Sequence, residues 1–191
     1  MAGMPEGRAL YATCAPCHGG KGQGVAALKA PAIAGLQAWY VQRQLQGFAA
    51  GWRGTAAGDV EGATMRAAAA VLTSDAQREA VASFVASLAP VNLPVQPSSD
   101  AARRINGRNY YNALCSACHG TNGRGNEQLG APRLAGMAPE YLMRQFAAFK
   151  AGQRGAHRED RLGAQMRAIS AMLPNRDTEQ DVIAHAARLP P

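Results

Sequence analysis

The 191-residue chain is poor in aromatic side chains and in long apolar runs. Aromatic residues make up only 6% of a chain that is 47% hydrophobic, so few large side chains are present to fill a core. No run of 18 or more apolar residues occurs, and we expect no membrane-spanning segment. The first residues, 1–5, are not a basic segment followed by an apolar stretch, so no signal peptide is visible.

Cysteine is also scarce, and its four copies all fall in two pentapeptides of identical spacing, 101 residues apart. Two cysteines at this spacing can each form a thioether to a porphyrin vinyl group, while the adjacent histidine binds iron from one face. A single pentapeptide could instead be half of a zinc site. Two copies that use every cysteine predict two covalently bound heme c groups. The residues are Cys14, Cys17 and His18 in the first pentapeptide and Cys115, Cys118 and His119 in the second.

The chain contains an internal repeat without gaps. A shift of 101 residues places 14–66 on 115–167, and 24 of these 53 positions are identical. The repeat predicts one fold twice, by duplication, with domains at 1–90 and 102–191 and a Pro-containing linker at 91–101. Domains of this size have small cores, to which a buried heme would contribute a large part.

Each copy is predicted to consist of helices joined by Gly-rich connections. In the first copy a helix at 6–14 leads into the cysteines, and a Gly- and Pro-rich stretch follows at 19–35. A second helix carries apolar residues at i, i+4 and i+7 from Val41, a loop comes next, and the last helix begins at Ser74, a residue typical of N-caps. No stretch alternates at period two, so an all-α protein is predicted. The corresponding parts of the second copy are 103–115, 120–136 and a last helix beginning at Asn175.

The second axial ligand of each iron decides whether the metal is open to other molecules. Methionine, a second histidine, lysine, tyrosine or no ligand are the alternatives. Met65 lies 47 residues after His18, and Met166 lies 47 residues after His119. We therefore predict both as iron ligands, the other interpretation being ordinary core methionines. The remaining methionines of the second copy align with no methionine of the first, and we predict that they pack in the core or lie on the surface. They are Met137, Met143 and Met172.

Two further histidines have no counterpart in the first copy. His185 aligns with Phe84 on the apolar face of the last helix, where a packed or interface imidazole is expected rather than an iron ligand. His157 aligns with Ala56 in a polar loop and is expected to be exposed.

Several repeated residues are candidates for contacts around the hemes. A carbonyl of Pro31 or Pro132 could accept from the imidazole N–H and fix the ring. Repeated tyrosines and arginines could bind the heme propionates, or they could lie on the surface of an amphipathic helix; both interpretations stay open. These residues are Tyr40, Arg43 and Arg53, with Tyr141, Arg144 and Arg154.

The formal charge of +7 is unevenly divided. Residues 1–95 carry seven Lys/Arg against five Asp/Glu, and residues 96–191 carry thirteen against eight. A basic surface suits nucleic acid, an anionic membrane or an acidic protein. We expect no nucleic-acid partner, because the arginines are scattered and no binding motif accompanies them. An acidic redox protein is the predicted partner, and a merely solvated basic surface is the alternative.

These motifs together resemble the diheme cytochrome c4 family. The resemblance implies two class I cytochrome c domains packed with pseudo-two-fold symmetry, which shuttle electrons in the bacterial periplasm. The chain would then be a mature form that has lost its export signal, a monomer when free, with peripheral membrane association allowed. One departure is the loop 153–163, which is strongly charged where the first copy is Gly/Ala-rich, so unlike heme environments are expected. The matching segments are the two Cys-x-x-Cys-His pentapeptides, 30–35 and 131–136, the helices following Tyr40 and Tyr141, and the two late methionines.

The predicted function is an electron carrier between a quinol-oxidising complex or dehydrogenase and a terminal oxidase or similar acceptor. The alternative is a diheme subunit of a larger dehydrogenase, such as a flavocytochrome that oxidises a sulfur compound. We predict no catalytic residue. A thiosulfate-oxidising cytochrome with a cysteine iron ligand would need a fifth cysteine, and a peroxidase would need an open iron.

Overall fold

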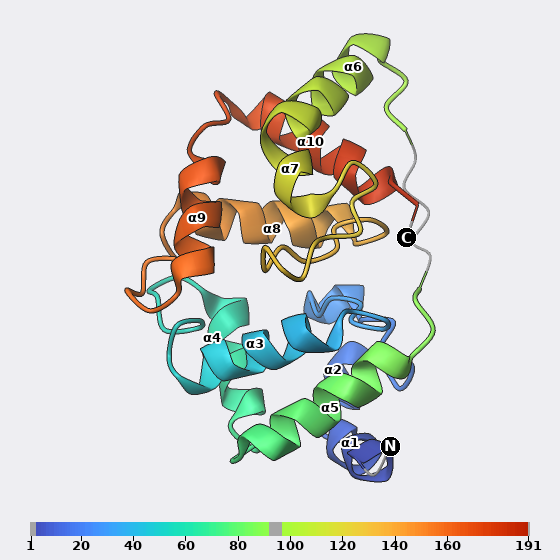
Figure 1. Cartoon of the computed structure of the whole chain (residues 1–191), viewed down its shortest axis with the longest axis vertical. Coiled ribbons are helices and arrows are strands. Elements are labelled where there is room, and N and C mark those ends of the chain that lie inside the picture. The colour runs from blue at the N-terminus through green and yellow to red at the C-terminus, as the bar shows by residue number, and fades with distance from the viewer. Residues whose placement is uncertain (1–2, 92–96, 191) are drawn as a thin grey trace. The chain divides into compact units, whose positions relative to one another are not determined.

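The computed structural model describes residues 3–91 and 97–190, which form two compact helical units (Figure 1). Within these ranges there is no strand, only the isolated bridges Val25–Ala30 and Asn126–Ala131. The predicted all-α fold is confirmed. Residues 92–96 of the predicted linker lie outside the described ranges. No described helix is long and apolar enough to cross a membrane.

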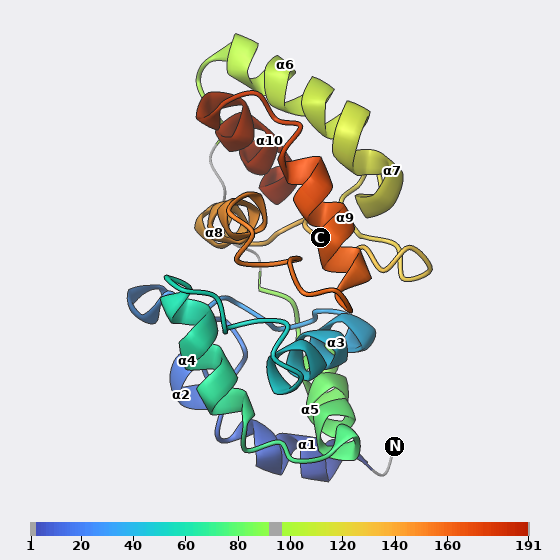
Figure 2. The same ribbon diagram turned by 90° about the vertical axis from the view of Figure 1, so that its left-hand side faces the viewer.

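The first unit is built around a crossing of its first and last helices. Helix α1 packs against α5, α5 packs against α3, and α3 contacts α4 (Figure 2). The buried core between them includes Tyr11, Phe48 and Val85. The helices are α1 (Gly3–Tyr11), α2 (Ala15–His18), α3 (Ala38–Ala49), α4 (Val60–Ala69) and α5 (Asp75–Ser87), with a 3-10 turn at Ala26–Leu28.

The second unit has the same order of helices. Helix α6 packs against α10, and α8 packs against both α9 and α10. The ends of α5 and α10 agree with the predicted N-caps, since Ser74 accepts from the Gln77 amide at 3.2 Å and Asn175 from the Thr178 amide at 2.9 Å. The helices are α6 (Ala101–Tyr110), α7 (Ser116–His119), α8 (Pro139–Lys150), α9 (Arg161–Ser170) and α10 (Arg176–Arg188).

The predicted loop between the second and last helices of each copy is wrong in part, because a further helix lies there. In the first unit this is α4, which carries Met65, and in the second it is α9, which carries Met166. Four alanines in α4 favour helix. The carboxylate of Asp59 caps the first turn by accepting from the Gly62 amide at 2.9 Å.

The second unit holds one extra residue ahead of its cysteines. Tyr11 and Tyr111 are both buried, and each hydroxyl donates to a backbone carbonyl at 2.7 Å. Two residues lie between Tyr11 and Cys14, but three lie between Tyr111 and Cys115. The extra residue is accommodated in a π-helical turn at Tyr111–Cys115. The first predicted helix therefore ends at Tyr11 in one unit and passes into a π turn in the other.

Two buried carboxylates distinguish the last helix of the second unit. Asp181 binds Arg103 Nε at 2.6 Å and the Asn106 amide nitrogen at 2.9 Å, joining α10 to α6. Glu179 binds Lys150 Nζ, joining α10 to α8. Buried charges of this kind must be paired, and both pairs hold α10 in place.

The helix crossing in the first unit makes a prediction. A Cβ on Gly7 would overlap the backbone carbonyl of Ala80 on α5, whereas a Cβ on exposed Gly20 would meet nothing within 4 Å. We expect Gly7→Ala to lower the free energy of unfolding by about 1–3 kcal/mol, because the helices must move apart. Gly20→Ala is the control and should change it by less than about 0.5 kcal/mol. Urea titration followed by circular dichroism measures both; equal midpoints would contradict this account of the crossing.

Candidate heme sites

In each unit the first cysteine of the pair directly precedes a short helix, and the second lies within that helix. Cys14 directly precedes α2 and packs against the hydrophobic core of the first unit, while Cys17 is exposed. Cys115 likewise directly precedes α7 and is half-buried, Cys118 is exposed, and all four thiols are free. Burial raises the pKa of Cys14, and it raises the pKa of Cys115 to about 11. Each unit thus presents an inner and an outer thiol one helical turn apart.

The histidine of each pentapeptide is buried and held by a proline carbonyl. His18 Nδ1 lies 2.9 Å from the Pro31 oxygen, and His119 Nδ1 lies 2.8 Å from the Pro132 oxygen. A carbonyl oxygen only accepts, so Nδ1 carries the proton and donates, and Nε2 is the nitrogen left to bind a metal. Burial lowers the pKa of both imidazoles, which keeps them neutral. The structure thus places the predicted prolines beside the predicted ligands.

A glycine allows the loop to bring each proline back to its histidine. Gly24 has φ +80°, and its amide donates to the His18 carbonyl at 2.7 Å. A Cβ at this position would come within 2.6 Å of the Ala32 amide nitrogen, so only glycine fits. Gly125 repeats these features, with φ +83° and a 2.8 Å bond to the His119 carbonyl.

The two buried tyrosines fix the other end of the same loop, a role the sequence analysis missed. Tyr11 donates to the carbonyl of Gly19, and Tyr111 donates to that of Gly120, each directly after the histidine. Burial raises the pKa of both phenols to about 12, so they remain donors. The one-residue insertion before Cys115 hid this match from a gapless alignment.

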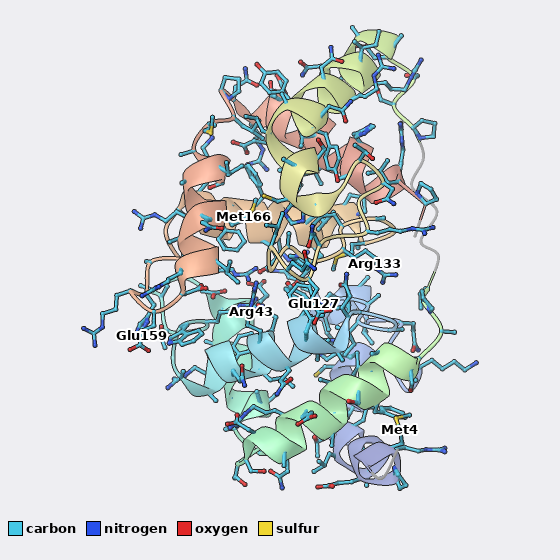
Figure 3. The ribbon with its side chains drawn as sticks, in the orientation of Figure 1. Met4, Arg43, Glu127, Arg133, Glu159 and Met166 are labelled. Carbon is cyan, nitrogen blue, oxygen red and sulfur yellow. The ribbon has the colours of Figure 1, made fainter. Side chains whose placement is uncertain are left out.

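The predicted methionine ligands lie on the fourth helix of each unit. Met65 is half-buried and packs against the core that Cys14 also contacts. Met166 is half-buried on α9 (Figure 3). Of the other methionines, Met137 is buried in the core and Met172 is 56% exposed, as expected of residues that pack in the core or lie on the surface.

The repeated arginines make matching contacts in both units. Arg53 donates to the Gln44 side-chain oxygen at 2.6 Å, with its guanidinium carbon 4.4 Å from the Phe48 ring centroid. Arg154 makes the same contacts with Gln145, at 2.7 Å, and with Phe149, at 4.2 Å. Arg43 and Arg144 lie about one turn beyond Tyr40 and Tyr141, with guanidinium carbons 5.9 and 6.0 Å from the tyrosine rings. The sequence analysis did not single out these two glutamines, which occupy equivalent positions in the repeat.

These residues fit a covalently bound heme. Each unit offers two free thiols one turn apart, a neutral imidazole whose Nδ1 is already bonded, and a half-buried thioether. In addition, the indole Nε1 of Trp52 is buried and has no hydrogen-bond partner among the described residues. A heme propionate is the kind of acceptor that such a donor needs.

Comparison with known proteins agrees with this geometry. The family model described as cytochrome c matches residues 5–89 and 105–187. A thiosulfate dehydrogenase electron acceptor of Stutzerimonas stutzeri is 33% identical over 82% of this chain and 72% of that protein. Cytochrome c4 of Azotobacter vinelandii is 28% identical over 90% of this chain and 82% of that protein.

Two solved structures share the fold. Cytochrome c4 from Pseudomonas stutzeri has a TM-score of 0.72 and 26% identity, covering 97% of this chain and 96% of its own. The thiosulfate dehydrogenase TsdBA from Marichromatium purpuratum has a TM-score of 0.75 and 28% identity, covering 98% of this chain; the chain spans 40% of that larger protein. The chain belongs to the cytochrome c family, as an electron-transfer protein of the diheme cytochrome c4 type whose Cys14–Cys17 and Cys115–Cys118 pairs attach two heme c groups.

Proposed function

We propose that the chain is a periplasmic carrier that accepts electrons from a dehydrogenase and passes them to a terminal oxidase or similar acceptor. The observation that carries this proposal is that both units repeat one set of groups suited to binding heme, namely two thiols and a buried imidazole held by a proline carbonyl. Covalent heme attachment normally takes place outside the cytoplasm, which supports a periplasmic location. Bound heme c supplies one-electron cycling between ferric and ferrous iron at each unit.

We further propose that Nε2 of His18 and the thioether of Met65 bind the first iron, and that His119 and Met166 bind the second. The proline carbonyls hold the imidazole rings in one orientation, so that each ring does not have to reorient when the charge on the iron changes. With a histidine and a methionine both bound, each iron would be closed to small molecules. This arrangement suits electron transfer and disfavours catalysis.

Arg53 and Arg154 are proposed to bind the heme propionates, with Trp52 as a further donor in the first unit. Each arginine is already oriented by a glutamine and an aromatic ring. A guanidinium held in this way can donate to a carboxylate without losing much conformational freedom. Tyr40 and Arg43 in the first unit, and Tyr141 and Arg144 in the second, are proposed as further propionate-binding residues.

The electron donor is proposed to be a thiosulfate dehydrogenase. Two relatives, from Stutzerimonas stutzeri and Thiomonas intermedia, carry the name thiosulfate dehydrogenase electron acceptor, and the TsdBA structure aligns along nearly the whole chain. All four cysteines of this chain are in the heme pentapeptides, so none is left for a catalytic heme with a cysteine ligand. This favours the accepting role. A quinol-oxidising complex is the alternative donor, and a permanent flavocytochrome complex is the alternative assembly.

The methionine assignment is tested by ligand replacement. Oxidised protein should show the weak sulfur-to-iron band at the far-red end of the visible spectrum. Met65→His should remove about half of this band and Met166→His the other half, because each methionine contributes one iron–sulfur bond. Met172→His, at an exposed position, is the control and should leave the band intact. Persistence of the full band in either ligand variant would reject that ligand.

The donor assignment is tested by stopped-flow reduction with thiosulfate dehydrogenase and thiosulfate. The α-band of the carrier should appear, and the second-order rate should fall as salt rises, because exposed charges are screened over about 8 Å at physiological ionic strength. Charge reversal of exposed Arg158 and Arg161 should slow the reaction further. Arg176→Glu, at the start of α10, is the matched control and should have a smaller effect.

Three outcomes would change this account of the donor, the docking face or the assembly. If the carrier stays oxidised with thiosulfate dehydrogenase but is reduced by a quinol-oxidising complex, the donor is wrong and the carrier role stands. A rate insensitive to salt and to both arginine changes would instead indicate an apolar docking face. Co-purification with a flavin-containing chain would favour the permanent complex.

A further inference from the structure

We propose that His185 is a proton-binding residue coupled to the second heme, so that the second unit takes up a proton from solvent at His185 when it takes up an electron. The first unit has no equivalent residue. The inference rests on the electron-carrier role, but it does not depend on which donor or acceptor the chain serves.

His185 lies one side chain away from the heme-attachment segment. It is half-buried on α10, and its ring centroid is 5.2 Å from that of Tyr111, at an interplanar angle of 56°. Tyr111 opens the π turn that ends at Cys115, and its hydroxyl donates to the Gly120 carbonyl, next to His119. An ionisable ring at this position must experience the charge of the iron, because the intervening protein screens poorly.

The first unit has a nonionisable ring in the same arrangement. Phe84 on α5 lies 5.2 Å from Tyr11, at an interplanar angle of 52°, and it packs against the core that Cys14 contacts. The exchange of Phe84 for His185 therefore changes the ionisable chemistry without changing the packing. At this position of the last helix, the second unit has a side chain that can bind a proton and the first unit does not.

The charged groups around His185 set the pH range of this coupling. Burial is the main cause that lowers the pKa of His185, and Arg188 on α10 and Arg108 on α6 lower it further. Asp181, four residues earlier on α10, is paired with Arg103 and Asn106 of α6. The phenol of Tyr111, whose ring contacts His185, stays neutral because its pKa is raised to about 12. These causes together hold the pKa of His185 below the ordinary histidine value.

The sign of the coupling follows from charge balance. Ferric iron plus one electron gives ferrous iron and removes one positive charge from the heme, so the proton affinity of His185 rises and, at pH values near its pKa, a fraction of a proton per electron is taken from water. Cationic His185 in turn favours the reduced heme. As pH rises through the pKa of His185, the proton is lost and the potential of the second heme falls. Between the two redox states we expect a change in proton affinity of about three- to tenfold, equivalent to about 30–59 mV at 59 mV per factor of ten.

The experiment is a site-resolved redox titration of the full diheme protein by NMR, from about pH 5 to pH 8. In the unaltered protein the second heme's potential should fall with rising pH by more than the first heme's. His185→Phe, which installs the residue of the first unit, should abolish this difference. Phe84→His should transfer it to the first heme, and His157→Ala, at an exposed histidine in the second copy of the repeat, should leave it unchanged.

A second measurement keeps the test decisive if a variant fails to fold. The pKa of the His185 imidazole, followed by NMR in unaltered protein, should be higher in chemically reduced than in oxidised protein. Equal values in the two states, or a pH dependence of the second heme that survives His185→Phe, would overturn the proposal. Because chemical reductants are used, failure of the donor assignment has no effect on this result.

Discussion

The hydrogen bond from each buried imidazole to a proline carbonyl thirteen residues later is the contact on which the rest of each unit depends. Because Nδ1 donates to the carbonyl, the proton stays on that nitrogen and Nε2 is the nitrogen that can bind iron. The hydrogen bond also requires the intervening loop to fold back, which explains the left-handed glycine at Gly24 and the tyrosine that fixes Gly19. That tyrosine lies in the crossing of the first and last helices. The hydrogen bonds made by His18 and Tyr11 to the two ends of this loop therefore connect the proposed iron ligand to the helix packing of the unit.

Duplication preserved these contacts and changed their surroundings. The π turn before Cys115 absorbs an added residue without moving Tyr111 from its carbonyl partner. On the last helix, Phe84 is replaced by His185, and positions equivalent to Arg78 and Ala80 become the paired carboxylates Glu179 and Asp181. Two units with the same fold and the same heme-binding groups therefore differ in charge and in ionisable neighbours. Such differences allow two chemically alike hemes to respond differently to pH and to partners.

Much of this could be predicted from sequence because the information is local. Thioether attachment needs two cysteines at one spacing, and the apolar period of α3 and the caps of α5 and α10 lie within a few residues. The sequence predicts a loop where α4 lies, because the alanines of this segment favour helix without marking an apolar face. The roles of Tyr11 and Gln44 depend on contacts between segments, which no local pattern records. The methionine spacing points to Met65 and Met166, and the structure places both half-buried on equivalent helices.

A coulometric redox titration of the purified protein, followed at its α-band, tests the central claim most directly. Two heme c groups with histidine and methionine ligands should take up two electrons per chain in one-electron steps. Both potentials should be positive, because thioether ligation stabilises ferrous iron within the range of about 0.8 V that axial ligands span. Uptake of a single electron per chain, or two strongly negative potentials, would contradict the account.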